Sequence, residues 1–138
     1  MNKLKYLKEL DELKLNINDY AIGGSGPLVI RGLKESNRDI DILVNNKVWN
    51  ELSNKLEILE IEINKKLVKY IQYKNIAILN SVQGFEDSEI EKVIDRADII
   101  EGYSFVSLED TIICKKSSGR EKDLKQVDKI KEYILKDN

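Results

Sequence analysis

Two short segments carry residue types suited to binding a nucleotide. Gly23-Gly24-Ser25-Gly26 follows the apolar Ala21-Ile22, and Asp39-Ile40-Asp41 opens a second apolar run. Glycines let backbone N–H groups approach a ligand closely, and a helix that begins at such a turn presents its positive end to phosphate. Side chains i and i+2 of a strand share a face, so Asp39 and Asp41 should project together. Taken alone, each segment also fits a plain turn or a strand with one polar face.

Two neighbouring aspartates repel each other, and a metal ion bound between them would remove this repulsion. Parallel carboxylates repel unless a positive charge lies between them. The chain contains no histidine and a single cysteine, which excludes Ser-His-Asp catalysis and His-ligated zinc. A metal would therefore be held by oxygen atoms, as Mg²⁺ or Mn²⁺ prefers. We expect Asp39 and Asp41 to be its ligands.

A basic segment lies further along the chain. Lys115 can neutralise phosphate as a point charge, and Arg120 can bind it through two hydrogen bonds. Asp123 falls in the first turn of the last expected helix, where its charge suits the helix dipole. It could equally orient Lys115 or Arg120 through an ion pair. The alternative is a solvated, charged junction between two helices.

The glycine–serine turn followed by D-x-D resembles the nucleotidyltransferase superfamily that includes DNA polymerase β. The matching residues are Gly24, Ser25, Asp39 and Asp41. The resemblance implies that the turn contacts the triphosphate of a nucleoside triphosphate (NTP). It also implies that the aspartates bind two Mg²⁺ ions and act in catalysis.

The segment from 107 to 130 resembles the C-terminal part of small bacterial and archaeal nucleotidyltransferases, including AbiEii-type toxins of abortive-infection and toxin–antitoxin systems. Those proteins carry S-x-x-D-L-I-x-x-K and then G-R-x-K-D. Thr111 replaces the leucine of the first pattern. The resemblance implies that Lys115 is a catalytic lysine. It also implies that three residues bind the nucleotide, namely Arg120, Lys122 and Asp123.

One feature of that superfamily has no counterpart in the sequence. Active members generally carry a third carboxylate on a later strand beside the D-x-D strand. The expected strand, 75–80, has no acid, and Ala77 or Asn80 occupies the place. Glu60 and Glu62 on the preceding expected strand are the remaining candidates.

Hydrophobic periodicity supplies the elements that must position these residues. It predicts strands over 19–22, 39–44, 56–63, 67–73 and 75–82, with an extended piece at 103–106. It predicts helices over 2–14, 27–32, 47–55, 88–97, 107–119 and 122–135. The expected fold is α+β, a single minimal nucleotidyltransferase domain over 1–138. A mixed sheet would be flanked by helices, and a helical pair would end the chain. Trp49, Tyr103 and Phe105 could lie in an interface or in the core, and we expect the core.

Composition limits the partners. The 23 basic and 25 acidic residues give a net charge of −2, so no overall charge favours nucleic acid or a membrane surface. No apolar run approaches the roughly 20 residues of a membrane span, and one cysteine allows no internal disulfide. We expect a cytoplasmic protein without membrane contact.

The favoured function is Mg²⁺-dependent transfer of a nucleoside monophosphate from an NTP to a hydroxyl or phosphate acceptor. The acceptor could be tRNA, a protein or a small molecule, and specificity could come from an antitoxin-like partner or a homo-oligomer. The alternative is a nucleotidyltransferase fold that only binds nucleotide or a partner. A third reading is an unrelated α+β protein in which Asp39 and Asp41 do not face Gly24 and Ser25.

Overall fold

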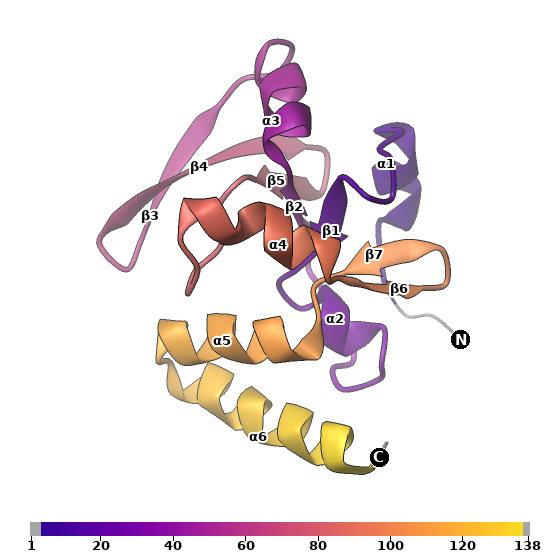
Figure 1. The fold of residues 1–138 in the computed structure, drawn as a ribbon, viewed down its shortest axis with the longest axis vertical. Coiled ribbons are helices and arrows are strands. Elements are labelled where there is room, and N and C mark those ends of the chain that lie inside the picture. The colour runs from indigo at the N-terminus through magenta and orange to yellow at the C-terminus, as the bar shows by residue number, and fades with distance from the viewer. Residues whose placement is uncertain (1–3, 137–138) are drawn as a thin grey trace.

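The computed structural model describes residues 4–136 and arranges their strands in one mixed sheet flanked by helices (Figure 1). The order across the sheet is β3-β4-β5-β2-β1-β7-β6. The strands are β1 (Tyr20–Ile22), β2 (Ile40–Val44), β3 (Leu59–Ile63), β4 (Lys66–Tyr73), β5 (Ile76–Leu79), β6 (Asp98–Ile100) and β7 (Tyr103–Phe105). The helices are α1 (Leu7–Glu12), α2 (Gly26–Val29), α3 (Asn46–Ser53), α4 (Ile90–Asp95), α5 (Leu108–Ser118) and α6 (Glu121–Lys136), with a 3₁₀ turn at Asp87–Glu89. The α+β expectation is confirmed at this level.

The centre of the sheet is formed by β1, β2 and β5. β2 runs antiparallel to β1 and parallel to β5. Ile40, Ile42 and Val44 alternate along β2 and are buried on one face. They pack with Ile76 and Ile78 of β5 because neighbouring residues in register share a face of the sheet.

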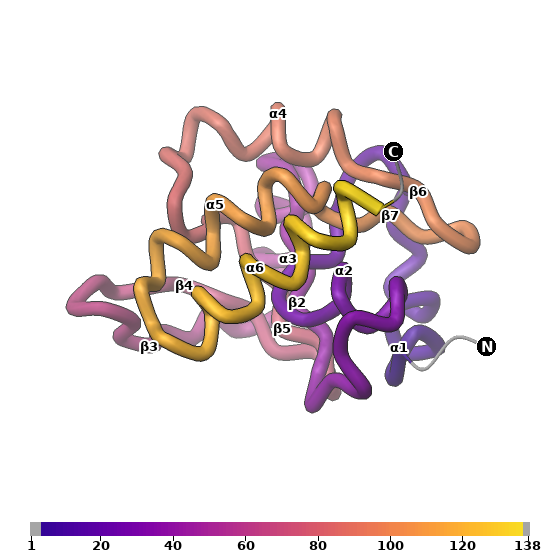
Figure 2. Tube along the Cα trace, turned by 90° about the horizontal axis from the view of Figure 1, so that it is seen from below, coloured from indigo at the N-terminus to yellow at the C-terminus, as the bar shows by residue number. Residues whose placement is uncertain are grey.

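Different helices cover the two faces (Figure 1). The face that carries Ile42 packs against Leu10 of α1 and Val48 of α3, and it includes Phe105 in its core. The opposite face packs Leu43 against Val93 and Ile94 of α4. Figure 2, seen from below, shows α6 crossing beside α5, the two helices that lie at the bottom of Figure 1. The sheet is therefore a central layer with helices on both sides.

The expected C-terminal helical pair is present: α5 lies between Ser107 and Gly119 as predicted, and α6 is one residue longer at each end than the expected 122–135. Ser107 caps α5 by accepting a hydrogen bond from the Asp110 N–H at 3.1 Å. Gly119 ends the helix with a φ of 68°. The Asp110 carboxylate is buried and accepts two hydrogen bonds from Arg96.

The structure shortens one expected helix markedly and adds one strand that was not expected. The helix expected over 2–14 is limited to α1, because Tyr6 has a φ of 74° and cannot continue a right-handed helix; residues 1–3 lie outside the described part. β6 was not expected from the sequence. It forms by antiparallel pairing with β7. Trp49 and Tyr103 are partly buried against the core and Phe105 is fully buried, as expected.

Within residues 4–136, no helix combines the length and the apolar character that crossing a membrane requires.

We predict that Gly26→Ala destabilises the fold by about 1–3 kcal/mol, the usual cost of overpacking. A Cβ on Gly26 would lie 2.4 Å from Cγ2 of Ile22, which is fully buried and branched at Cβ. Urea unfolding measures the change. The matched control is Gly23→Ala, whose Cβ would lie 3.7 Å from Val106. Equal free energies of unfolding for the two variants would contradict the packing.

Candidate functional site

Strand pairing brings the glycine turn onto the second aspartate. β1 pairs with β2 so that Ile22 lies opposite Ile42. Immediately beyond, the Gly23 N–H donates to the Asp41 carbonyl at 2.8 Å. A Cβ on Gly24 would lie 2.5 Å from Oδ2 of Asp41. The Asp41 carboxylate therefore lies directly against the turn, as the sequence predicts.

The turn offers hydrogen-bond donors that the protein itself does not use. Within residues 4–136, no hydrogen bond engages the backbone N–H of Gly24 or Ser25, or the Ser25 hydroxyl. α2 begins directly after them but has only four residues. A helix this short has a weak dipole, so these three donors are what the turn can offer to an anion.

Asp41 is a carboxylate without a positive partner. It is partly buried, and no ion pair joins it to a lysine or arginine in the described chain. Burial raises its pKa to about 6, and the charge of Asp39 contributes in the same direction. Asp39 is exposed, just before β2. A cation at this position would stabilise the ionised form of Asp41 against desolvation and against repulsion by Asp39.

The row of residues beside Asp41 contains no third acid. Asp41 lies opposite Ala77 of β5, and Ala77 lies opposite Gln72 of β4. Asn80 donates its side-chain N–H to the Val44 carbonyl at 2.8 Å and so serves the sheet. The expected position of the third carboxylate is thus occupied by Ala77.

The alternative acids are on the wrong face. Glu60 lies opposite Lys69, one residue out of phase with the Asp41–Ala77–Gln72 row. Since side chains alternate along a strand, Glu60 and Glu62 point to the face opposite Asp41. They also lie on β3, three strands away from β2. Neither glutamate can replace the missing acid.

The predicted basic residues at the α5–α6 junction are held by an internal network. Asp123 is buried and accepts hydrogen bonds from the Ser118 hydroxyl and from Arg120 Nε, the latter at 2.9 Å. Lys115 Nζ lies 3.6 Å from Asp123 Oδ1 and donates to Gln126 Oε1 at 2.6 Å. Asp123 therefore orients the two cations, which was one of the roles expected for it.

The two predicted cations differ in exposure. The Lys115 side chain is 13% exposed, whereas that of Arg120 is 71% exposed. Burial lowers the pKa of Lys115, the charge of Asp123 opposes this shift, and Lys34 adds to it. Lys122 is exposed. Arg120 and Lys122 can meet a ligand directly, while Lys115 must first leave Gln126.

Lys34 was missed by sequence reasoning. It lies in the loop between α2 and β2. Burial lowers its pKa, with further lowering by Lys122 and Arg38, while Asp123 raises it. The sequence signal that could have indicated Lys34 is its position between the glycine turn and Asp39. Its closeness to Lys122 and Asp123 depends on tertiary packing of the loop, which the sequence does not show.

The two halves of the predicted site are joined through apolar packing. Leu28 of α2 packs with Leu108 of α5 and Ile130 of α6, and Leu33 packs against the same cluster. Within residues 4–136, no hydrogen bond or ion pair connects Asp39 or Asp41 to the basic network. The acidic and basic groups are therefore not paired with each other in this part of the chain.

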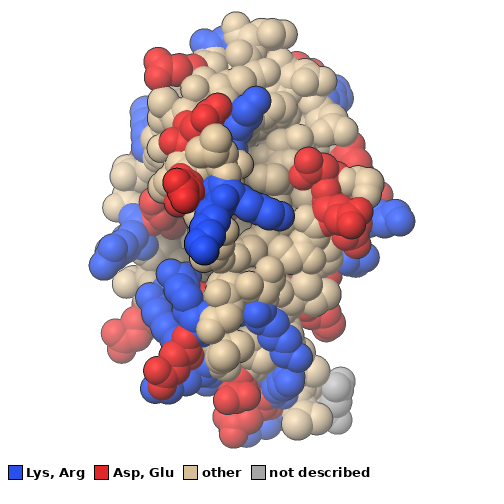
Figure 3. Space-filling view, turned by 90° about the vertical axis from the view of Figure 1, so that its left-hand side faces the viewer, with Lys and Arg blue, Asp and Glu red and all other residues tan. Residues whose placement is uncertain are grey.

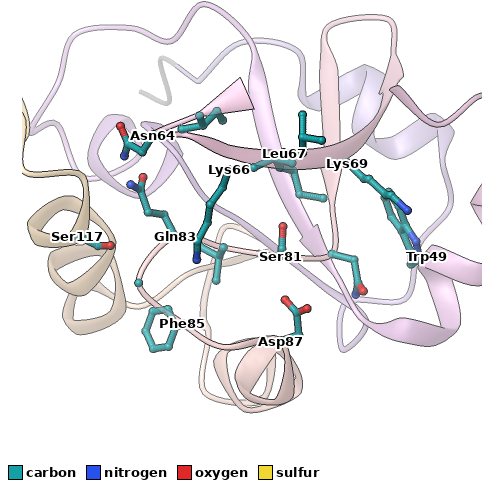
Figure 4. A pocket seen from close by; sticks show the side chains of 16 residues that line it. Trp49, Asn64, Lys66, Leu67, Lys69, Ser81, Gln83, Phe85, Asp87 and Ser117 are labelled. Atoms are coloured by element: carbon teal, nitrogen blue, oxygen red, sulfur yellow. The ribbon is translucent and has the colours of Figure 1, made fainter. Parts of the chain in front are cut away.

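A separate cavity of about 740 Å³ lies between the β3–β4 hairpin, residues 80–87 and the end of α5 (Figure 4). Its lining includes Trp49, Lys66, Ser81, Phe85, Asp87 and Ser117. Neither Asp39 nor Asp41 lines it. The cavity and the aspartates are therefore distinct places.

Comparison with protein-family models, curated proteins and solved structures found no match.

We predict that Asp41 makes the fold less stable as pH rises from about 4 to about 6. A carboxyl whose pKa is about 6 in the fold, against an ordinary 3.8, keeps its proton more readily when folded. Its contribution is present below pH 4 and is lost as pH rises through 6, by about 2–3 kcal/mol at most.

Urea unfolding at pH 4 and pH 7 should show the effect as a difference between the protein and Asp41→Asn. At pH 7 the free energy of unfolding of Asp41→Asn should be higher, relative to that of the unsubstituted protein, than it is at pH 4. Val44, Ile42 and the rest of the core are unchanged by this substitution. A constant difference across this pH range would contradict the prediction.

Proposed function

We propose that this chain is a Mg²⁺-dependent nucleotidyltransferase that moves a nucleoside monophosphate from an NTP to a hydroxyl or phosphate acceptor. The observation that carries the proposal is the pair of unused N–H groups at Gly24 and Ser25, directly beside the unpaired Asp41 carboxylate. Phosphate binds such donors, and a divalent cation shared with the phosphate suits the carboxylate. We place the reaction in the cytoplasm, with tRNA, a protein or a small molecule as acceptor.

The donor set suits magnesium held partly by substrate. Within residues 4–136, no group of three or more His, Cys, Asp or Glu side chains is arranged to hold a metal. Mg²⁺ is usually bound by one or two carboxylates together with substrate phosphates and water, which Asp39 and Asp41 can satisfy. Bound there, the ion would neutralise charge on the phosphates.

The remaining roles belong to the protein. Gly24 and Ser25 would donate to the phosphates and fix their orientation. Arg120 and Lys122 would stabilise the triphosphate, with Lys34 and Lys115 adding positive charge. Positioning and electrostatics dominate phosphoryl transfer. An acceptor oxygen held in line with the α-phosphorus can therefore attack it and release pyrophosphate, and the acceptor's proton passes to water where no carboxylate takes it.

A second candidate is a nucleotide-binding module without transfer activity. Ala77 favours it, because this residue stands directly opposite Asp41 where a third carboxylate would be expected. Both candidates require nucleotide binding and differ only in whether a product forms.

We predict Mg²⁺-dependent NTP binding that depends on the aspartates. Calorimetric titration with ATP, GTP, CTP and UTP should show binding in Mg²⁺ for at least one nucleotide. Asp39→Ala/Asp41→Ala should weaken it by about tenfold or more, equivalent to about 1.4 kcal/mol. The matched control is Asp128→Ala/Glu132→Ala, which removes two exposed acids of α6.

Incubation with labelled NTP, Mg²⁺ and total tRNA or protein then separates the two candidates. Labelled acceptor that disappears in the aspartate variant supports transfer. Binding without labelled acceptor supports the module. Absence of Mg²⁺-dependent binding for all four nucleotides would overturn both.

We predict that Gly24→Ala abolishes nucleotide binding, whereas Gly32→Ala, which introduces a similar backbone strain, does not. Gly24 and Gly32 have φ values of 57° and 77°, where a side chain is strained. Only at Gly24 would the new Cβ meet Asp41; at Gly32 nothing lies within 4 Å. Gly32→Ala should therefore lose similar stability but keep NTP affinity. Equal affinities in the two variants would refute the role of the turn.

A further inference from the structure

β3 is an edge strand with unusual exposure. Among the described strands it lies at the end of the sheet and pairs with β4 alone. All its residues after Leu59 are exposed. These include Ile61 at 48% and Ile63 at 43% exposed. Edge strands that are open in this way are templates for a further strand.

The hairpin turn fixes which backbone groups point outward. Asn64 and Lys65 form a two-residue turn with φ values of 51° and 66°, as a type I′ turn requires. The pair that closes such a turn, Ile63 and Lys66, is hydrogen-bonded, and bonded pairs alternate along an antiparallel ladder. The N–H and C=O groups of Glu60 and Glu62 therefore face away from β4.

The side chains of β3 divide cleanly by chemistry. Leu59, Ile61 and Ile63 lie on one face, while Glu60 and Glu62 lie on the other. Lys69 stands opposite Glu60, but Glu62 stands opposite Leu67 and has no cation across the ladder. Figure 3, seen from the side on which the hairpin lies in Figure 1, shows acidic and basic side chains with uncharged surface between them.

Charge decides what can occupy this edge. A second copy pairing antiparallel about Ile61 would place Glu60 directly opposite Glu62, and like charges opposite each other destabilise a sheet. A strand that alternates apolar and basic residues would instead place apolar side chains beside Ile61 and Ile63. Its lysines or arginines would stand beside Glu60 and Glu62.

We propose that the β3 edge binds an extended segment of a partner protein, with alternating apolar and basic residues, as an eighth strand of the sheet. The outward N–H and C=O groups of Glu60 and Glu62 bond to its backbone. The two carboxylates select its charge. This proposal is independent of the nucleotide site, because β3 lies three strands away from β2.

A capped eight-residue peptide of alternating valine and lysine is the probe. Titration followed by amide NMR and hydrogen exchange should show at least tenfold slower exchange for the Glu60 and Glu62 amides. A valine–glutamate peptide of equal length should not bind. Glu60→Lys/Glu62→Lys should reverse this preference between the two peptides.

Proline separates backbone pairing from simple charge attraction. Glu62→Pro removes an outward N–H but leaves the ladder to β4 unbroken, since that N–H does not point to β4. Glu62→Gln removes the same charge and keeps the N–H. Glu62→Pro should lose more peptide affinity than Glu62→Gln, while the exchange of the Ile61 amide reports that the hairpin is intact.

Three results would overturn the proposal. These are equal binding of both peptides, no protection at Glu60 and Glu62, and self-association of the protein through β3 in sedimentation.

Discussion

The hydrogen bond from the Gly23 N–H to the Asp41 carbonyl is the constraint on which the candidate site depends. At 2.8 Å it continues the pairing of β1 with β2 for one residue beyond Ile22. The chain then turns at Gly24, whose φ of 57° suits glycine. This turn leaves the Gly24 and Ser25 N–H groups unused and sets the Asp41 carboxylate against them. Loss of the register would separate the donors from the acid.

The charges of the site are arranged in two unequal halves. At the α5–α6 junction, Asp123 pairs with Arg120 and Lys115, so part of the positive charge of that half is compensated. Within residues 4–136 no cation pairs with Asp41, and burial and Asp39 raise its pKa. Most carboxylates that a fold buries are paired, because an unpaired charge is costly to desolvate. The uncompensated half is therefore the one that most needs a ligand, which is the physical basis of the proposed metal–nucleotide site.

The alternation of strand side chains accounts for both the missing acid and the open edge. Because side chains alternate along each strand, the register of the sheet places Ala77 beside Asp41 and places Glu60 and Glu62 on the other face. The same alternation puts the two glutamates together on one face of β3 and puts Ile61 and Ile63 on the other face. Two acids that fail as catalytic candidates thus give the edge its charge, and they disfavour pairing between copies of the chain.

The sequence by itself determined the local structure. Alternation at Ile40, Ile42 and Val44 marked β2, and Ser107 and Gly119 marked the two ends of α5, because periodicity and capping act over a few residues. It also indicated that Asp41 and the glycine turn would meet. The nucleotidyltransferase assignment stays a proposal.

Only the tertiary structure decided which residues share a row or a face. It placed Ala77 opposite Asp41, turned Glu60 to the far side, paired the short β6 with β7 and brought Lys34 close to Lys122. Each of these depends on register or packing between segments distant in the chain, and a one-residue change of register reverses every side chain of a strand.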